Sequence, residues 1–451
     1  MRVTSPGDLG LVPVAPGRLP LLGHATQLAR RPLPFLCSLR GLGPLVRVDV
    51  GTWPLYVATT PAAAHDVLVA RARYFDKGRL FDRLRPMLGE GLITSNGSFH
   101  RDQRRRVQPA FSRARLDDYT DVMSRHARAM AEAWRPGETV ALTEALQDLT
   151  FATLAEVMFS AHTAPGTRIA CSMAQVNAGI PARALLPHAL TRLPLPFNRR
   201  FDRAIALLHA AVDDTVRRHR TGAAPDPGLL SVLTQPDLHG TKMTERHIRD
   251  ETITLMLAGS ETTATVLSWA FHHLAQRPDL AQRVQRELDT VLRDRPLRAA
   301  DLPALGCTRQ VLSETLRLHP LTLVMRRSHS PTAVQGIVIP PGTEVAVSAY
   351  AIQRDPGLYA DPLSFDPDRW TRQEITELPK GACAPFGEGN RKCIGEAFAW
   401  NHMSVVVAEV LRRWHLRPAP GHTVREVASI HPYPDSLPMT VTHRPCFRKA
   451  G

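Results

Sequence analysis

The amino-acid sequence predicts a mainly α-helical protein with small β-sheets. From Pro61 to about Leu292, long segments rich in Ala, Leu and Arg alternate with Pro- and Gly-containing breaks, a pattern typical of successive helices. Short segments of alternating polarity occur before and after this region, and a last helix is predicted from Glu396 to Arg413. No internal repeat or low-complexity block interrupts the 451 residues. We therefore expect a single domain over 1–451, with β-rich N-terminal and meander portions around a helical core.

The predicted strands lie in two portions of the chain. Leu45 to Val50 alternates in polarity, and Trp53 to Val57 follows a Gly-containing turn, so these two segments predict a β-hairpin. Short strands are predicted again near Gly336 to Pro340 and Glu344 to Ala349. A Pro-rich meander then leads to the last helix. The sheets are therefore accessory to the helices.

Composition excludes several classes of protein. Hydrophobic residues make up 43% and charged residues 22%, which is typical of a globular chain and not of a disordered or fibrous one. No stretch approaches the roughly 18 apolar residues of a spanning helix, and the Pro-interrupted N-terminus lacks the apolar core of a secretion signal. Six dispersed cysteines do not suit a disulfide framework. We expect a cytoplasmic protein without a membrane anchor.

The net charge of +14 raises the question of nucleic acid. However, 51 of the 56 basic residues are Arg, and they are scattered without a long run interleaved with aromatic residues. This distribution indicates a solvated surface. We expect no nucleic-acid partner.

The segment from Phe386 to Gly395 carries the strongest chemical signal. It reads FGEGNRKCIG, a turn with glycines and a cation beside Cys393, immediately before a predicted helix. Glycines allow positive φ and close approach to a flat ligand, while free backbone N–H groups stabilise a thiolate. This pattern suits a thiolate held against a metal, with Arg391 available for an anionic group of the same cofactor. A lone cysteine would more often be a buried structural residue, but the full pattern favours the ligand.

This segment resembles the haem-thiolate loop of the cytochrome P-450 monooxygenases, FxxGxRxCxG, at every fixed position. The resemblance runs from near Pro16 to Leu437 and implies the cytochrome P-450 fold. It implies haem b with Cys393 as axial ligand, Phe386 near the sulfur and Arg391 at a haem propionate. Among its members the chain is most similar to bacterial terpene oxidases of the pentalenene oxygenase and albaflavenone monooxygenase type.

A second match is Glu314-Thr315-Leu316-Arg317. Residues three apart share a helix face, so Glu314 and Arg317 can pair, although E-x-x-R is common and usually a solvated ion pair. The segment around Arg369 resembles the Pro-x-Arg segment of the family. By this resemblance the three residues form a buried network that fixes the meander before the cysteine loop, and such networks contribute geometry more than net stability.

A third match, Ala258 to Thr263, lies in a long predicted helix from about Thr244 to Ala275. It resembles the central helix that crosses the distal face of the haem. Because Gly259 weakens the helix and the Thr262 hydroxyl can bond a carbonyl one turn back, we expect a local bulge. Glu261 and Thr262 are then the catalytic acid–alcohol pair that relays protons. Alone, these residues would be read as the wet face of an ordinary helix.

Weaker matches extend the cofactor site. His100 and Arg104 lie one turn apart where the family often has Trp and Arg, and both would reach haem propionates. Arg326 falls nine residues after Arg317, where a further propionate partner is expected, with Arg327 as the alternative. Gln353 departs from the usual His of this family and is assigned no role.

The resemblance also places the substrate. The expected pocket walls are apolar or uncharged, which favours an apolar small molecule: Thr254, Leu257, Ala258, Thr322, Val324 and Leu437. A Gly-containing loop from Met87 to Phe99 is expected to be flexible and to cover the site, and 173–197 suits a mobile lid. Asp213-Asp214 is read as a solvated helix face.

The implied reaction is insertion of one oxygen atom from dioxygen into a C–H bond, in the secondary metabolism of a terpene. No nicotinamide- or flavin-binding motif is present, so NAD(P)H must act through redox partners, expected to be ferredoxin and ferredoxin reductase. A monomer is expected. Alternatives left open are a hydroxylase of a macrolactone, fatty acid or steroid, and a haem protein acting as a peroxygenase or sensor.

Overall fold

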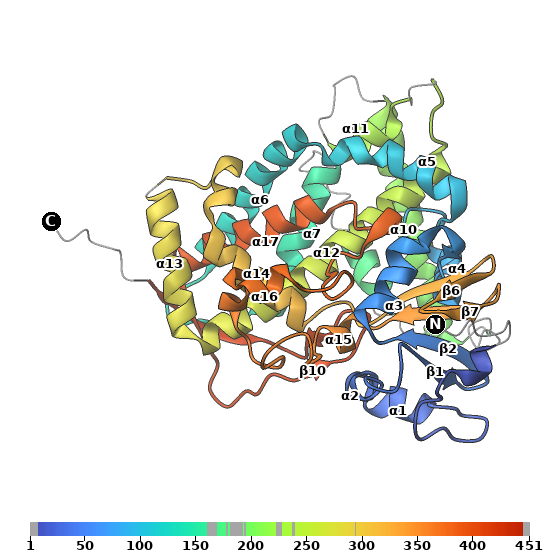
Figure 1. The fold of residues 1–451 in the computed structure, drawn as a ribbon. Coiled ribbons are helices and arrows are strands. Elements are labelled where there is room, and N and C mark those ends of the chain that lie inside the picture. The colour runs from blue at the N-terminus through green and yellow to red at the C-terminus, as the bar shows by residue number, and fades with distance from the viewer. Residues whose placement is uncertain are drawn as a thin grey trace. The chain divides into compact units, whose positions relative to one another are not determined.

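The computed structural model describes residues 8–444 except 160–168, 177–178, 181–192, 194, 222–227, 237–239 and 294. The chain forms two compact units. The first contains Met1–Arg79, Arg309–Cys393 and Arg425–Asp435, and the second contains Leu80–Thr308, Ile394–Val424 and Ser436–Gly451. Figure 1 shows the helices and strands coloured along the chain. The predicted lid over 173–197 lies largely outside the described residues.

The first unit is built on a five-stranded sheet with the order β1-β2-β8-β5-β3. Neighbouring strands are antiparallel except for the parallel pair β2 and β8. The strands are β1 (Leu45–Val50), β2 (Trp53–Ala58), β8 (Glu344–Val347), β5 (Val324–Ser328) and β3 (Phe75–Asp76). Two small antiparallel pairs accompany it: β6 (Thr332–Val334) with β7 (Ile337–Ile339), and β10 (Glu426–Val427) with β11 (Tyr433–Pro434).

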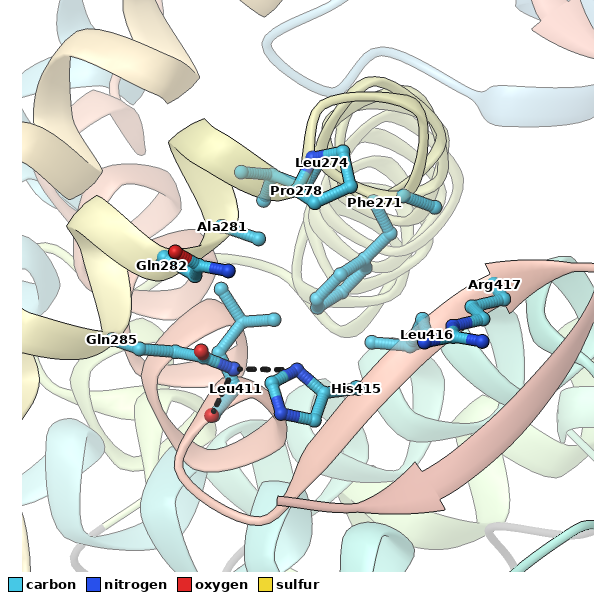
Figure 2. Close-up of a pocket in the computed structure, with 11 residues that line it drawn as sticks. Phe271, Leu274, Pro278, Ala281, Gln282, Gln285, Leu411, His415, Leu416 and Arg417 are labelled. Carbon is cyan, nitrogen blue, oxygen red and sulfur yellow. Dashed lines mark hydrogen bonds between the residues drawn. The ribbon is translucent and has the colours of Figure 1, made fainter. Parts of the chain in front are cut away.

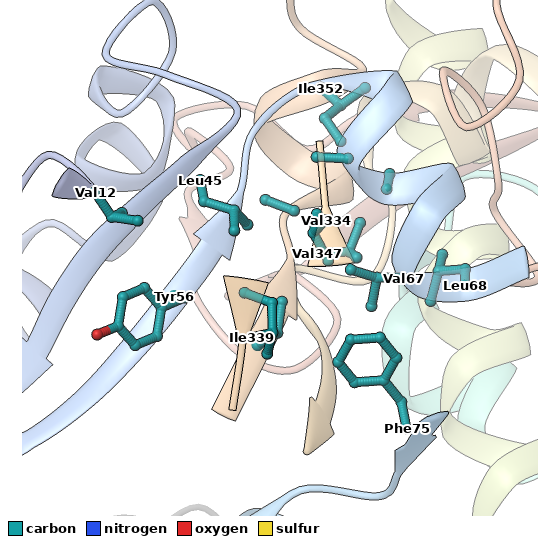
Figure 3. Close-up of a cluster of buried hydrophobic side chains, with 14 residues drawn as sticks. Val12, Leu45, Tyr56, Val67, Leu68, Phe75, Val334, Ile339, Val347 and Ile352 are labelled. Carbon is teal, nitrogen blue, oxygen red and sulfur yellow. The ribbon is translucent and has the colours of Figure 1, made fainter. Parts of the chain in front are cut away.

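A cluster of branched aliphatic side chains fills the core of the first unit (Figure 3). β-branched residues such as Val345 and Val347 favour strands, and their inward side chains meet Val67 and Leu68 from the helical turns after β2. The short helices of this unit are α1 (Ala25–Arg30), α2 (Pro32–Ser38), α3 (Pro61–His65), α15 (Ala349–Ile352) and α16 (Gln373–Thr376), with turns η1 (Asp8–Leu11), η2 (Asp66–Ala70), η3 (Ala72–Tyr74), η6 (Pro367–Thr371) and η7 (Gly389–Arg391).

Long helices form the second unit. Its centre is α12 (Glu245–Gln276), which packs against α7, α10, α13 and α17. The other elements are α4 (Arg79–Leu88), α5 (Gly97–Val107), α6 (Arg113–Ala133), α7 (Leu142–Phe159), α10 (Pro196–Thr221), α11 (Leu229–Thr234), α13 (Pro278–Leu292) and α17 (Glu396–Leu411), with η4 (Gln108–Phe111) and η5 (Ala299–Ala304). α14 (Gly306–Leu318) begins in this unit and ends in the first.

The bounds of α12 follow from local chemistry. Thr244 caps its N-terminus, because the side-chain oxygen accepts a hydrogen bond from the His247 N–H at 3.2 Å. The helix ends at Gln276, and Pro278 then starts α13, where its fixed φ suits a first turn. Between these ends most side chains are buried, so the helix is held by packing on several sides.

The predicted mainly α fold with small sheets is confirmed. The hairpin of β1 and β2 is also confirmed, with Leu45 opposite Ala58 and Val50 opposite Trp53. The last helix ends two residues earlier than predicted. A second-unit sheet was not predicted: β4 (Thr139–Ala141), β12 (Pro438–His443) and β9 (Trp414–Pro418) pair antiparallel. Within the described part of the chain, no helix is long and apolar enough to cross a membrane.

Candidate functional site

The cysteine loop, Phe386 to Gly395, carries an exposed Cys393. Its own backbone N–H donates to the Phe386 carbonyl at 2.8 Å, and the Gly387 N–H donates to the Ala384 carbonyl at 2.9 Å. These bonds close the loop on itself, so the position of the cysteine is set by backbone geometry. The loop therefore fixes the backbone of an exposed cysteine.

Gly389 explains why the loop needs a glycine at that position. Its φ is +69°, which L residues rarely adopt, and an added Cβ would lie 2.1 Å from the Leu68 carbonyl oxygen. Gly387 also has φ of +69°, but nothing lies within 4 Å of its Cβ position. Gly389 is therefore needed for the close packing of η7 on η2, whereas Gly387 is needed only for its backbone conformation.

Three cations gather beside this loop in the first unit. Lys77, Arg326 and Arg391 are close enough for the two arginines to lower the pKa of Lys77, in addition to the larger effect of its burial. Burial and Arg391 lower the pKa of Arg326 to about 10. Asp76 lies beside them, with Oδ1 3.3 Å from Arg391 Nη2. The cluster therefore places like charges close together where burial disfavours them.

The strand β5 decides between Arg326 and Arg327. Arg326 is buried at 6% exposure, whereas Arg327 beside it on the strand is partly exposed and its Nη1 lies 3.7 Å from Glu344. Lys77 was not singled out from the sequence. Asp76 directly precedes it in β3 and pairs with Arg327 in register, and this pairing brings Lys77 to the cluster.

Glu314, Arg317 and Arg369 lie together in the first unit. Arg317 donates to both oxygens of Glu314 at 2.7 and 2.8 Å, and Arg369 Nε donates to Glu314 Oε1 at 3.3 Å. Trp370 Nε1 also donates to Glu314, at 3.0 Å. The remaining donors of Arg317 reach the carbonyls of Gln353, Pro362 and Ser364. The network thus ties α14 to the meander.

Gln353, which was assigned no role, belongs to this network. Its side-chain Nε2 donates to the carbonyls of Leu316 and Arg317 at 3.2 and 2.9 Å. It therefore satisfies carbonyls at the C-terminal end of α14, where helix carbonyls lack intrahelical partners. The departure from the family's His at this position is the sequence signal that could have found it.

Glu261 and Thr262 are neighbours on α12 in the second unit. The Thr262 hydroxyl donates to the Ala258 carbonyl at 2.7 Å. The Glu261 side chain is exposed, but neighbouring protein shields part of its carboxyl from water. This partial loss of hydration raises the pKa of Glu261. The predicted bulge is wrong, because the structure is α-helical throughout Glu245–Gln276. Gly259 instead serves close packing, since an added Cβ would lie 2.9 Å from the Leu154 side chain of α7.

The predicted pocket residues differ in exposure. Leu257, Ala258 and Val324 are partly exposed, whereas Thr254, Thr322 and Leu437 are buried. The Thr322 hydroxyl donates to the Ser429 carbonyl at 2.6 Å, so that this residue also fixes the segment that carries β10 and β11. Cys393, Thr322 and Val324 belong to the first unit, and Thr254, Leu257, Ala258, Leu437, Glu261 and Thr262 to the second. Their common pocket stays a prediction.

His100 and Arg104 lie one turn apart on α5 in the second unit, His100 buried and Arg104 partly exposed. Because they are four residues apart, His100 and Arg104 lie on one face of the helix. Asp102 and Arg105 form an exposed ion pair on the same helix. Their contact with a cofactor stays a prediction.

A cavity of about 230 Å³ lies elsewhere in the second unit, between α12, α13, α17 and β9 (Figure 2). Its apolar floor contains Phe271, Leu274 and Leu411, and Gln285 Nε2 closes one side by donating to the Leu411 carbonyl at 3.2 Å. The same nitrogen lies 3.3 Å from His415 Nδ1. None of the predicted site residues lines this cavity.

The residues of the cysteine loop and the cation cluster suit an iron porphyrin with two carboxylates. A closed loop presents an exposed cysteine, and three cations lie close enough together to lower one another's pKa. Buried like charges are costly unless an anion joins them. Two propionates would supply that anion, and the thiolate would supply the axial ligand.

Comparison with known proteins gives full-length matches. The model of the family described as Cytochrome P450 matches residues 13–431. Cyclooctat-9-en-7-ol 5-monooxygenase of Streptomyces melanosporofaciens is 38% identical over 436 residues, covering 95% of each chain. Cyclooctatin synthase of the same organism is 40% identical over 419 residues, covering 91% of each. Pentalenene oxygenase of Streptomyces avermitilis is 35% identical over 436 residues, covering 95% of this chain and 97% of its own.

Proposed function

The chain belongs to the cytochrome P450 family, and from this premise we propose that Cys393 is the axial haem ligand and that the substrate is a terpene hydrocarbon. As a family member the chain is a haem-thiolate monooxygenase, an oxidoreductase that uses dioxygen, with NAD(P)H acting through redox partners. When bound, the haem activates dioxygen so that one oxygen atom enters a C–H bond. The other parts of the site bind, orient and exclude water.

The closed loop at Cys393 carries this proposal. The hydrogen bond from the Cys393 N–H to Phe386 and the positive φ of Gly387 and Gly389 fix the backbone of the turn that carries the cysteine. A fixed turn would hold the Cys393 thiolate in a constant position for haem iron, whose chemistry the thiolate would tune. Arg326, Arg391 and Lys77 would bind propionates, and His100 and Arg104 would do so from α5.

Proton delivery is the proposed role of Glu261 and Thr262. Because the Thr262 hydroxyl donates its hydrogen to Ala258, its oxygen keeps lone pairs that can accept a hydrogen bond from water. The raised pKa of Glu261 keeps a proton on its carboxyl to higher pH than usual, which suits a group that must hold a proton before passing it on. The pair can therefore pass protons along α12.

The substrate class is inferred from the walls and from the relatives. Leu257, Ala258 and Val324 present apolar surface, and apolar walls hold a hydrocarbon while excluding water. One relative is named for oxygenation of cyclooctat-9-en-7-ol and another for pentalenene. A terpene skeleton fits both observations. We place the reaction in secondary metabolism.

The redox partners belong to the same proposal. Ferredoxin and ferredoxin reductase would carry electrons from NAD(P)H to the haem, because the sequence has no flavin or nicotinamide motif of its own. A cytoplasmic monomer is the proposed form of the enzyme. Gel filtration of the loaded protein tests the monomer.

Two measurements test the function. The reduced protein with carbon monoxide should show a thiolate-type absorbance band, and turnover with ferredoxin, its reductase and NAD(P)H should hydroxylate pentalenene or a related hydrocarbon. A band typical of a nitrogen ligand would refute the thiolate. Binding of fatty acids or steroids in preference to terpenes would overturn the substrate class.

A further inference from the structure

Two consecutive carboxyl groups on α12 hold the chain that connects α4 and α5. Asp250 Oδ2 accepts the Glu90 backbone N–H at 3.0 Å, and Glu251 Oε2 accepts the Leu92 N–H at 3.2 Å. Asp250 and Glu251 are 1% and 0% exposed. All of these residues lie in the second unit. We call Gly89 to Thr94 the 89–94 segment.

Glycines bring the 89–94 segment into direct contact with α12. Gly89 has φ of +66°, and an added Cβ would lie 2.0 Å from the Asp250 carboxyl carbon. An added Cβ on Gly91 would lie 2.1 Å from Thr254 Oγ1. The sequence predicted a flexible loop from these glycines. The structure instead uses them for close approach, which brings the segment's N–H groups within reach of the two carboxyls.

The 89–94 segment is also closed on itself. The Thr94 hydroxyl donates to the Gly89 carbonyl at 2.6 Å, and the Arg85 guanidinium donates to the Thr94 carbonyl at 3.1 Å. Gln103 of α5 donates to the Glu90 carbonyl at 3.3 Å. The segment therefore moves as a unit, and the two carboxyls are its attachment to α12.

We propose that Asp250 and Glu251 are positioning residues that latch the 89–94 segment onto α12 and so set how readily ligands enter the substrate site. The inference rests on the proposed function, since it takes α12 and the α4–α5 connection as walls of that site. Leu257 and Ala258 follow Thr254 by one turn on the same helix, so release of the segment uncovers α12 beside them.

The latch depends on pH. Burial, together with Asp250, raises the pKa of Glu251 to about 8, although the Leu92 N–H opposes this shift. Oε1 of Glu251 has no hydrogen-bond partner, and no cation pairs with this carboxyl among the described residues. The carboxyl is therefore neutral in the closed state near pH 7. Ionisation leaves a charge without a cation in a dry place, and opening to water relieves it.

The charged groups around Glu251 come from three elements and the segment itself. On α12, Arg249 and Arg246 lie 3.5 and 4.0 Å from Asp250. Asp213 of α10 pairs with Arg249 at 3.0 Å, and His209 of α10 lies 3.1 Å from the Met87 carbonyl. The segment contributes Glu90, and α4 contributes Arg85. The arginines on α12 pair with Asp250 and Asp213 and not with Glu251. Ionisation of Glu251 is therefore not compensated by a paired cation, and this ionisation favours opening of the latch.

Hydrogen–deuterium exchange of the holoenzyme tests the latch. Glu251→Ala should lower the protection of the amides of residues 89–95 about tenfold at about pH 5, where ionisation contributes little to opening, since loss of one buried hydrogen bond is of that order. Glu251→Gln keeps the accepting oxygen and cannot ionise. Its protection should stay constant from about pH 5 to pH 8, whereas wild-type protection should fall over this range, because opening lets Glu251 ionise at its ordinary pKa. The two proteins should agree near about pH 5. Glu245→Gln, an exposed carboxyl on the same helix, is the matched control.

Access to the haem gives a second readout. The rate at which 4-phenylimidazole binds the iron should rise in Glu251→Ala at about pH 6 and, in wild type, between about pH 6 and 8. Gly91→Ala acts from the segment side, and it replaces Glu251→Ala if that variant does not fold. Unchanged protection in both variants, or equal loss in Glu251→Gln and Glu251→Ala, overturns the latch. A missing thiolate band with carbon monoxide refutes the proposed function instead, because amide exchange does not depend on it.

Discussion

Arg317 and Glu314 are joined by two hydrogen bonds, from Nε to Oε2 at 2.8 Å and from Nη2 to Oε1 at 2.7 Å, and both side chains are fully buried. Bidentate geometry of this kind uses the planar guanidinium that only arginine has. Arg369, Trp370 and the Asp366 backbone N–H also donate to this carboxylate. The single negative charge of Glu314 is therefore shared by two buried arginines.

Glu314→Gln should destabilise the protein strongly. The amide has nearly the same shape, but the substitution leaves Arg317 and Arg369 without a counter-charge, and breaking such a buried pair costs about 3–5 kcal/mol. The midpoint of thermal unfolding should fall markedly. Asp279→Asn, which removes an exposed partner of Arg277, is the control and should change stability by at most about 1 kcal/mol. Equal midpoints for the two variants would contradict this ranking.

Cys393→Ser should abolish the thiolate-type band of the reduced protein with carbon monoxide. A hydroxyl is a far weaker ligand than a thiolate, so the haem should also be lost more readily. Cys383→Ser is the matched control. Burial raises the pKa of the Cys383 thiol to about 12, which makes it unsuitable as a thiolate. Retention of the band in Cys393→Ser would remove Cys393 as the ligand.

Thr262→Ala should separate NAD(P)H consumption from product formation. Without the hydroxyl on α12, protons reach the bound oxygen in a less ordered way, and reducing equivalents should be released as peroxide. Product per NAD(P)H should fall severalfold while NAD(P)H oxidation continues. Ser260→Ala deletes a hydroxyl that likewise donates one turn back, to Met256, and should keep its coupling. The same coupling in both variants would exclude Thr262 from proton delivery.

Sequence and structure agree most where the deciding contacts are local. The family and the fold class are confirmed, and Glu314 and Arg317 are three residues apart on one helix, so their contact follows from helix geometry. Lys77 was missed because the register of the two-residue strand β3 on β5 brings it to Arg326, and no local pattern announces such a pairing. The bulge at Gly259 was wrong because Leu154 of α7 occupies the space beside it. Tertiary packing decides such positions.

Glu251→Gln should stabilise the protein increasingly as pH rises from about 4.5 to about 8. In this range wild-type Glu251 is ionised when unfolded and protonated when folded, so the folded state binds the extra proton and its stability falls with pH. The glutamine variant cannot ionise, so its stability does not fall with pH for this reason. Its advantage should reach a few kcal/mol above pH 8 and vanish near pH 4.5. Thermal unfolding at several pH values measures it, and a difference independent of pH would contradict the burial of a neutral carboxyl.

Lys77→Met should weaken haem retention. Burial, followed by the repulsion from Arg326 and Arg391, lowers the pKa of Lys77, so its charged form is disfavoured until an anion joins the cluster. The two propionates of a bound porphyrin would attract the three cations, so that binding of the porphyrin would favour the charged form of Lys77. The rate of haem transfer to an acceptor such as apomyoglobin should therefore rise severalfold at pH 7. The haem-free variant should lose none of its stability.

Two further variants show whether charge is the cause. Lys77→Arg keeps the cation and should restore slow haem transfer, whereas Lys380→Met removes an exposed lysine of the same unit and should leave the rate unchanged. High salt should narrow the difference between wild type and Lys77→Met only slightly, since buried pairs are poorly screened. If Lys77→Met and Lys77→Arg release haem equally fast, the side chain acts through packing, and the propionates are held by Arg326 and Arg391 alone.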